Sequence, residues 1–278
     1  MIPTALNLPY RPAKPRQRGL TMVIDNGLPT RLFTDAVESA GDLIDFIKFG
    51  WGTAVVSRNI GEKIAVCEAN GIGYFFGGTL FEKHLLQGRF DDFRRYCADH
   101  RCRYVEVSNG TVSLTNDEKA RYVEKLAAEF IVFSEVGVKD AARSEQLKAP
   151  DWVRFVREDL EAGARLVIAE ARESGRSGIC HADGTLRADV LNALLGAGIS
   201  TDKLLFEAPT KDLQTAFIRR VGPNVNLGNV APGDVVGVET LRLGLRSDTL
   251  TATTATLPGG AHIAPIGRSR DLAAAPNF

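Results

Sequence analysis

Charged residues recur at or near the ends of short apolar runs in this 278-residue chain, and their types indicate metal-assisted chemistry on an anion. Lys48 lies within the run FIKF, and Asp25 ends the run LTMVID. Four further runs carry glutamates: Glu106, Glu135, Glu170 and Glu207. If the runs are strands whose ends meet, these acids repel one another and need a cation, from Lys48, Lys139, Arg172 or a divalent metal. Hard carboxylate oxygens favour Mg²⁺ over zinc or copper.

The alternation of side chains along a strand indicates which way the acids point. In LVIAE, Glu170 shares a face with Leu166 and Ile168, and in YVEVS, Glu106 shares a face with Ser108. A carboxylate beside residues that line a core is costly unless it is paired or bound to a metal. The pattern alone also allows the acids to cap the next helix or to bridge neighbouring strands.

A second anion site is predicted in the segment NLGNVAPGD, residues 226–234. Gly228, followed by Asn229, lets backbone N–H groups approach an anion, and the dipole of a helix that follows favours negative charge. An ordinary turn into a helix is the alternative. No histidine lies at the end of a predicted strand, so a histidine base is not expected.

The elements that must position these residues alternate along the chain. The predicted strands are residues 20–25, 46–49, 74–76, 104–108, 130–135, 166–170, 204–207 and 225–227. Helical spacing predicts helices at residues 34–40, 59–69, 81–95, 117–129, 151–162, 187–195, 212–220 and 235–245. Eight such units predict a (β/α)8 TIM barrel, whose site lies at the carboxyl ends of the strands. An open doubly wound sheet is the alternative, but no Gly-x-Gly-x-x-Gly follows the first strand.

Composition limits the class of protein. Lys plus Arg equals Asp plus Glu at 34 each, so no basic excess indicates a nucleic-acid partner. No run reaches the roughly 18 apolar residues of a membrane helix. The four cysteines are expected to be reduced thiols of a cytoplasmic protein. We expect an N-terminal extension at residues 1–18, a catalytic barrel at 19–250 and a tail at 251–278. A homo-oligomer is also expected to be possible, because the outer helices of a barrel offer surfaces for contact between subunits.

Blocks of sequence across about residues 14–250 resemble the phosphosulfolactate synthase family. They are KPR at 14–16, GLTMVID at 19–25, DFIKFGWGT at 45–53, VEVSNG at 105–110, SEVG at 134–137, AEARESG at 169–175, FEAP at 206–209, NVNLGNV at 224–230 and ETLRLGLRSDT at 239–249. Two positions depart from the family pattern. Asn109 stands where many members have Asp, and Val138 stands where a second Lys is frequent.

The resemblance implies a barrel enzyme that adds sulfite to phosphoenolpyruvate with Mg²⁺, giving (2R)-phospho-3-sulfolactate, as in coenzyme M biosynthesis. It implies a metal ion held among Glu106, Glu135, Glu170 and Glu207. Lys139 is then the first choice of general acid and Lys48 the second, and Arg172 binds sulfite or phosphate. The predicted substrate-binding residues are Asp25, Ser108, Gly228 and Asn229. The alternatives are a related phosphoenolpyruvate enzyme with another nucleophile and a non-enzymatic stress-associated homologue.

Overall fold

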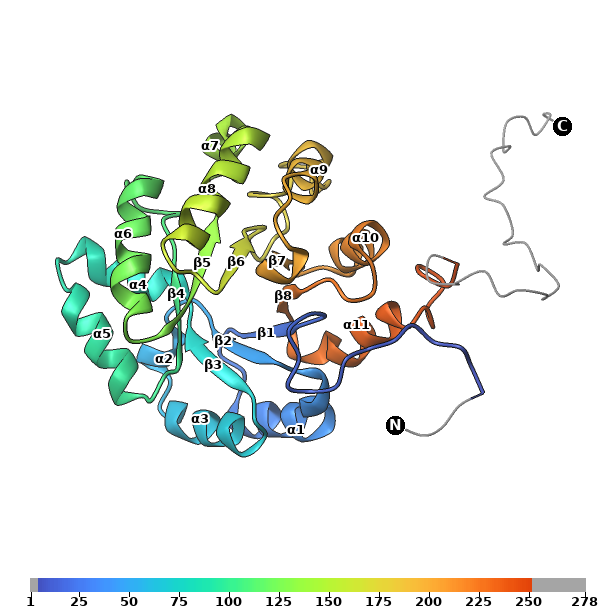
Figure 1. Cartoon of the computed structure of the whole chain (residues 1–278). Helices are drawn as coiled ribbons and strands as arrows, with labels where there is room; N and C mark the ends of the chain where they lie inside the picture. The colour runs from blue at the N-terminus through green and yellow to red at the C-terminus, as the bar shows by residue number, and fades with distance from the viewer. Residues whose placement is uncertain (1–4, 252–278) are drawn as a thin grey trace, which may run out of the picture.

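The computed structural model describes residues 5–251 and arranges eight parallel strands as a barrel surrounded by helices (Figure 1). The predicted tail at 251–278 lies outside the described residues apart from Thr251. The strands are β1 (Thr21–Asp25), β2 (Phe46–Phe49), β3 (Gly73–Phe76), β4 (Tyr104–Val107), β5 (Ile131–Val136), β6 (Leu166–Ala169), β7 (Leu204–Glu207) and β8 (Leu227–Val230).

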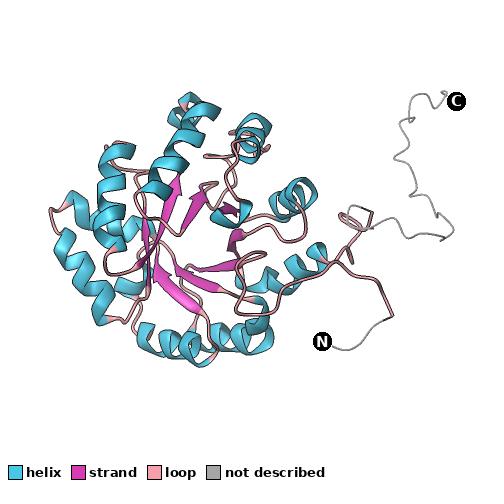
Figure 2. Ribbon diagram, in the orientation of Figure 1, coloured by secondary structure: helices cyan, strands magenta, loops and turns pink. Residues whose placement is uncertain are grey.

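Helices lie outside the strands over the whole ring (Figure 2). They are α1 (Thr30–Ala40), α2 (Thr53–Val56), α3 (Ile60–Ala69), α4 (Gly78–Leu86), α5 (Phe90–Asp99), α6 (Asn116–Ala127), α7 (Ala141–Gln146), α8 (Ala149–Glu161), α9 (Ala188–Gly196), α10 (Lys211–Val221) and α11 (Val235–Arg242), with short 3₁₀ turns η1 (Gly41–Leu43), η2 (Thr201–Lys203) and η3 (Pro232–Asp234). Within residues 5–251, no helix is long and apolar enough to span a membrane.

The hydrogen-bonded strand order is β3-β2-β1-β8-β7-β6-β5-β4, which confirms the predicted barrel over the doubly wound alternative. Pairing of β1 with β8 joins the first and last strands. The seam of the ring lies between β3 and β4, where the described strands form no ladder. Aromatic rings bridge this seam inside the barrel, since Phe46 and Phe75 pack edge-on against Tyr104 and Phe133 at centroid distances of 5.0 and 5.3 Å, respectively.

Two differences from the predicted elements bear on the site. The last strand lies at Leu227–Val230 and not at 225–227, because the side chain of Asn226 bonds Leu20 N and Leu204 O ahead of the ladder. Gly228 and Asn229 are therefore strand residues. The helix predicted at 81–95 is two helices, α4 and α5, because Gly88 between them takes a left-handed φ of 66°.

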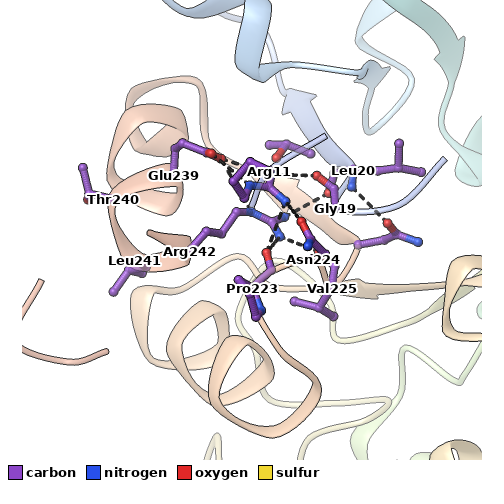
Figure 3. Close-up of polar contacts among 12 residues, drawn as sticks. Arg11, Gly19, Leu20, Pro223, Asn224, Val225, Glu239, Thr240, Leu241 and Arg242 are labelled. Carbon is purple, nitrogen blue, oxygen red and sulfur yellow. Dashed lines mark hydrogen bonds and ion pairs between the residues drawn. The ribbon is translucent and has the colours of Figure 1, made fainter. Parts of the chain in front are cut away.

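Polar contacts of Arg11 and Arg242 join the amino-terminal segment to α11 and to the residues ahead of β1 and β8 (Figure 3). Arg11 forms an ion pair with Glu239 of α11 and donates to Gly19 O. Arg242, also on α11, is fully buried and donates to the carbonyl oxygens of Pro223, Val225 and Leu20 at 2.8, 2.6 and 3.0 Å. This buried guanidinium joins α11 to the segments that enter β1 and β8.

Replacing Arg242 with methionine is expected to lower the free energy of unfolding by about 3 kcal/mol, because Val225 O loses its donor and Pro223 O and Leu20 O each lose one of two donors. Urea denaturation measures the loss. Arg157→Met is the matched control, since Arg157 is exposed and donates only to Ala197 O, so it should cost under about 1 kcal/mol. Equal losses in the two variants would contradict the assignment.

Candidate active site at the carboxyl ends of the strands

A cavity of about 610 Å³ opens at the carboxyl ends of the strands. Its charged lining comes from four strands, from the loops after β5 and β6 and from α7. Those residues are Lys48, Glu106, Glu135, Lys139, Asp140, Arg143, Glu170, Arg172, Glu173 and Glu207. The structure thus brings the four predicted glutamates and the three predicted cations to one pocket.

Lys48 of β2 lies at the centre of the acidic groups. Its Nζ is 3.1 Å from Glu106 Oε2, 3.1 Å from Glu207 Oε1 and 3.5 Å from Glu135 Oε2. Burial alone would lower the pKa of Lys48, but Glu106, Glu207 and Glu135 outweigh burial and raise it well above its usual value. Lys48 is therefore a fixed positive charge.

Lys139 follows β5 and reaches the same acids from the rim. Its Nζ is 3.4 Å from Glu135 Oε1 and 3.8 Å from Glu170 Oε2. The stem of Lys139 lies against Gly110, where an added Cβ would be 3.2 Å from Lys139 Cγ. About 24% of its side chain is exposed, against 7% for Lys48, so Lys139 is the lysine that a substrate can reach. Burial lowers its pKa, but Glu135 and Glu170 raise it more.

Burial and neighbouring charges shift the pKa values of three of the glutamates in different directions. Burial raises the pKa of Glu106 to about 7, although Lys48 opposes the shift. Burial raises the pKa of Glu170 well above its usual value, and Glu135 and Glu207 add to the shift. Burial acts in the same direction on Glu135, but Lys139 and Lys48 outweigh it and lower that pKa to about 2. These opposite shifts favour the proton on Glu170 and the negative charge on Glu135 when no divalent cation is bound.

The acidic groups fit a divalent cation by geometry and by charge. Oxygen atoms of Glu135, Glu170 and Glu207 lie within 4.8 Å of one another. Glu170 Oε2 is buried and accepts no hydrogen bond. When all of these groups are ionised, the four glutamates carry four negative charges and Lys48 and Lys139 carry two positive charges. One divalent cation would balance the two negative charges that remain. This buried acidic triad could hold a metal ion.

Two further predicted residues line the cavity. Arg172 has φ 58° and donates from Nη1 to Lys139 O at 3.3 Å, so it lies beside the lysine at the rim. Asn229 of β8 has φ 52°, and its buried Oδ1 accepts no hydrogen bond. This unpartnered amide oxygen, on a residue that lines the cavity, leaves an acceptor free for a ligand.

Three predicted substrate-binding residues lie outside the lining. Asp25 shares the outer face of β1 with Val23, bonds Lys63 of α3 at 2.5 Å and accepts from Gly27 N and Leu28 N. Ser108 follows the end of β4 and donates to Glu82. Gly228 faces the barrel core, where an added Cβ would meet Leu205 Cδ2 at 2.4 Å.

Sequence reasoning missed several charged residues at or near the pocket, among them Glu82 and Arg143. Glu82 of α4 is buried, accepts from Ser108 Oγ at 2.5 Å and from Thr111 N at 3.2 Å, and so holds the loop after β4. Arg143 of α7 lines the cavity four residues after Lys139. Neither follows an apolar run, and Glu82 lies beside Lys83 and His84 in the stretch LFEKHLL, so no clear signal in the sequence marks either residue.

A parallel (β/α)8 barrel with acids and lysines converging at the carboxyl ends of its strands defines a barrel enzyme acting on small molecules. Within that class, the chain belongs to the (2R)-phospho-3-sulfolactate synthase (ComA) family, whose model matches residues 9–248. It is 48% identical over 245 residues to the phosphosulfolactate synthase of Bacillus subtilis, covering 88% of this chain and 97% of the relative. It is 42% identical over 246 residues to that of Methanothermobacter thermautotrophicus, covering 87% and 95%.

Solved structures support the fold alone. Thiamine phosphate pyrophosphorylase from Pyrococcus furiosus superposes with a TM-score of 0.50 and 9% identity, over 81% of this chain and 96% of that one. The chain is therefore an enzyme of the phosphosulfolactate synthase family on a barrel scaffold, and the stress-associated, non-enzymatic alternative is not favoured.

Proposed function

We propose that the protein catalyses the Mg²⁺-dependent addition of sulfite to C3 of phosphoenolpyruvate, giving (2R)-phospho-3-sulfolactate. The observation that carries the proposal is a single pocket in which Lys48, Lys139 and Arg172 face four strand-end glutamates, in a chain of this family. Two anions must meet for this reaction, and the cations offset their repulsion while the pocket holds them in reacting geometry.

The cations at the rim bind the anionic groups of the substrates. Arg172 presents a guanidinium fork that matches the oxygens of sulfite or phosphate. Arg143 adds a second guanidinium to the lining of the cavity. Asn229 offers its free Oδ1 to a donor of the substrate or of bound water. We assign no direct contact with substrate to Asp25, Ser108 or Gly228, because none of the three is among the residues that line the cavity.

The bond-forming step needs one proton. The sulfur lone pair of sulfite forms the bond to C3, the electron pair of the double bond moves toward the carboxylate, and C2 then takes a proton on one face. Lys139 is the proposed donor, because its Nζ is the more exposed of the two lysine ammonium groups. Glu135 and Glu170 orient that ammonium, and Lys48 stays charged among the acids.

Glu135, Glu170 and Glu207 would hold the Mg²⁺, with Glu106 beside them. A bound Mg²⁺ stabilises negative charge that develops on the substrate carboxylate. The chain's own acids keep the two lysines in place and protonated. All four cysteines are free buried thiols, which is in keeping with the cytoplasmic setting that we include in the proposal.

The affinity for Mg²⁺ is expected to rise with pH through about 7. Glu106, with its pKa raised to about 7, and Glu170, whose pKa is raised well above its usual value, hold protons at low pH, and the metal ion must displace them. Calorimetry in two buffers of different ionisation enthalpy should show that Mg²⁺ binding releases protons. For each proton released, the Mg²⁺ affinity should rise about tenfold per pH unit at pH values below the pKa of the carboxyl group that releases it. An affinity that is flat between about pH 6 and 8 would contradict this.

The direct test incubates the purified protein with phosphoenolpyruvate, sulfite and Mg²⁺ and follows the phosphorus NMR spectrum. Phosphosulfolactate should appear only when all three are present. Parallel reactions with phosphite and with a thiol test the alternative nucleophiles. The absence of a sulfite-dependent product would overturn the proposal.

A further inference from the structure

A second cavity, of about 280 Å³, opens at the opposite end of the barrel from the catalytic pocket. One wall is the amino-terminal segment that Figure 3 shows anchored through Arg11. Lys14 donates to Gly41 O and Ile44 O at 3.0 and 2.7 Å, and Arg16 forms an ion pair with Asp45 at 2.8 Å. These contacts fix the wall.

The floor of this cavity is aromatic. Phe46, Tyr104 and Phe133 meet there, with Phe46 edge-on to both other rings at centroid distances of 5.0 and 5.1 Å. Phe46 and Tyr104 are only half-buried, whereas Lys48 and Glu106, two residues further along the same strands, are buried. The edges of these rings thus remain open to the cavity, and they offer edge-to-face packing to another ring.

The rim of the cavity carries an excess of positive charge. Four basic side chains line it, Lys14, Arg16, Arg103 and Arg165, against two acids, Asp45 and Asp202. Within residues 5–251, Arg103 and Arg165 form no ion pair. Arg103 lies 5.9 Å from the centroid of the Tyr104 ring, and Arg165 bonds the neutral side chain of Gln17. Two guanidinium groups are therefore left to bind an anion.

We propose that this cavity binds a small organic anion with an aromatic body, such as an aryl carboxylate or aryl sulfonate. The ring packs on Phe46, Tyr104 and Phe133, and the anionic group lies between the Arg103 and Arg165 guanidinium groups, whose donors match two oxygens of such a group. The volume limits the ligand to about one ring with its substituent, since drug-sized ligands take larger pockets. The site is separate from the catalytic pocket and does not depend on its assigned reaction.

Saturation-transfer NMR and calorimetry with benzenesulfonate and benzoate test the proposal on the whole protein, with Mg²⁺ and phosphoenolpyruvate present to occupy the catalytic pocket. Both probes should bind. Benzyl alcohol, which lacks the charge, and methanesulfonate, which lacks the ring, should each bind at least about tenfold more weakly. No binding by either aryl anion up to about 10 mM, or displacement by phosphoenolpyruvate, would overturn the proposal.

A double substitution locates the probe. Arg103→Gln with Arg165→Gln should weaken benzenesulfonate binding by about tenfold or more while the protein stays folded, since both side chains are exposed. The control, Arg95→Gln with Arg121→Gln, removes the same charge from exposed ion pairs on α5 and α6 and should leave binding unchanged. Equal weakening in both double variants, or none in the first, would refute the assigned site.

Discussion

Replacing Lys139 with methionine is expected to lower kcat by about 10²–10⁴-fold, because C2 loses its proton donor in the transition state. Methionine keeps the length of the apolar stem that lies against Gly110, so the loop after β4 should retain its packing. Glu135 and Glu170 lose one cationic partner but keep each other, and Lys48 still neutralises Glu135. The steady-state rate at which phosphosulfolactate forms from phosphoenolpyruvate and sulfite measures the loss of kcat.

The control is Lys83→Met on α4, an exposed lysine outside the pocket lining, which should leave kcat unchanged. Running the reaction in deuterated water adds a second readout, since Lys139→Met should also slow incorporation of deuterium at C2. A variant with normal kcat and normal incorporation would remove Lys139 from the proton transfer and leave the fold and the metal site untouched.

The second large effect is expected for Glu135→Gln, with about a 10²–10³-fold drop in kcat/KM and about 10–100-fold weaker Mg²⁺ binding. Glu135 is the acid that contacts both lysines and also belongs to the triad of candidate metal ligands. A neutral amide removes one ligand charge and leaves Lys48 and Lys139 with fewer partners. Turnover at increasing Mg²⁺ and calorimetry of the metal separate the two losses.

Glu161→Gln, an exposed position at the end of α8, serves as the control and should change neither quantity. If excess Mg²⁺ restores full turnover to Glu135→Gln, the residue acts through metal binding alone and its proposed role in orienting Lys139 is wrong. If Mg²⁺ affinity is unchanged, the triad does not hold the ion.

Alternation along strands predicted the acids that the barrel holds in its mouth, because Glu106, Glu135 and Glu207 lie on strands and their direction is set by the residues before them. The same rule explains the position of Asp25. Met22 and Ile24 face the interior of the barrel, so Asp25, the next residue, points outward to Lys63 on α3. Applying alternation to that strand would have placed Asp25 outside the pocket.

Other positions depend on where regular structure ends, which the pattern of apolar residues does not fix. Ser108 would share the inward face of Glu106 if β4 continued, but the strand ends at Val107 and the chain turns toward Glu82. Gly228 was expected in a loop, and the side chain of Asn226 instead shifts the start of β8, so that Gly228 packs on Leu205. Arg143 belongs to a short helix without apolar spacing, so no periodic signal marks it.

The buried contacts of Lys48 also constrain how this sequence can diverge. Glu106, Glu135 and Glu207 come from three strands, and each has part of its charge neutralised by the same ammonium group. Loss of Lys48 alone would leave three buried acids without this shared positive charge, which costs several kcal/mol. Lys48 is therefore expected to be replaced only together with its acidic partners, although these residues lie far apart in the chain.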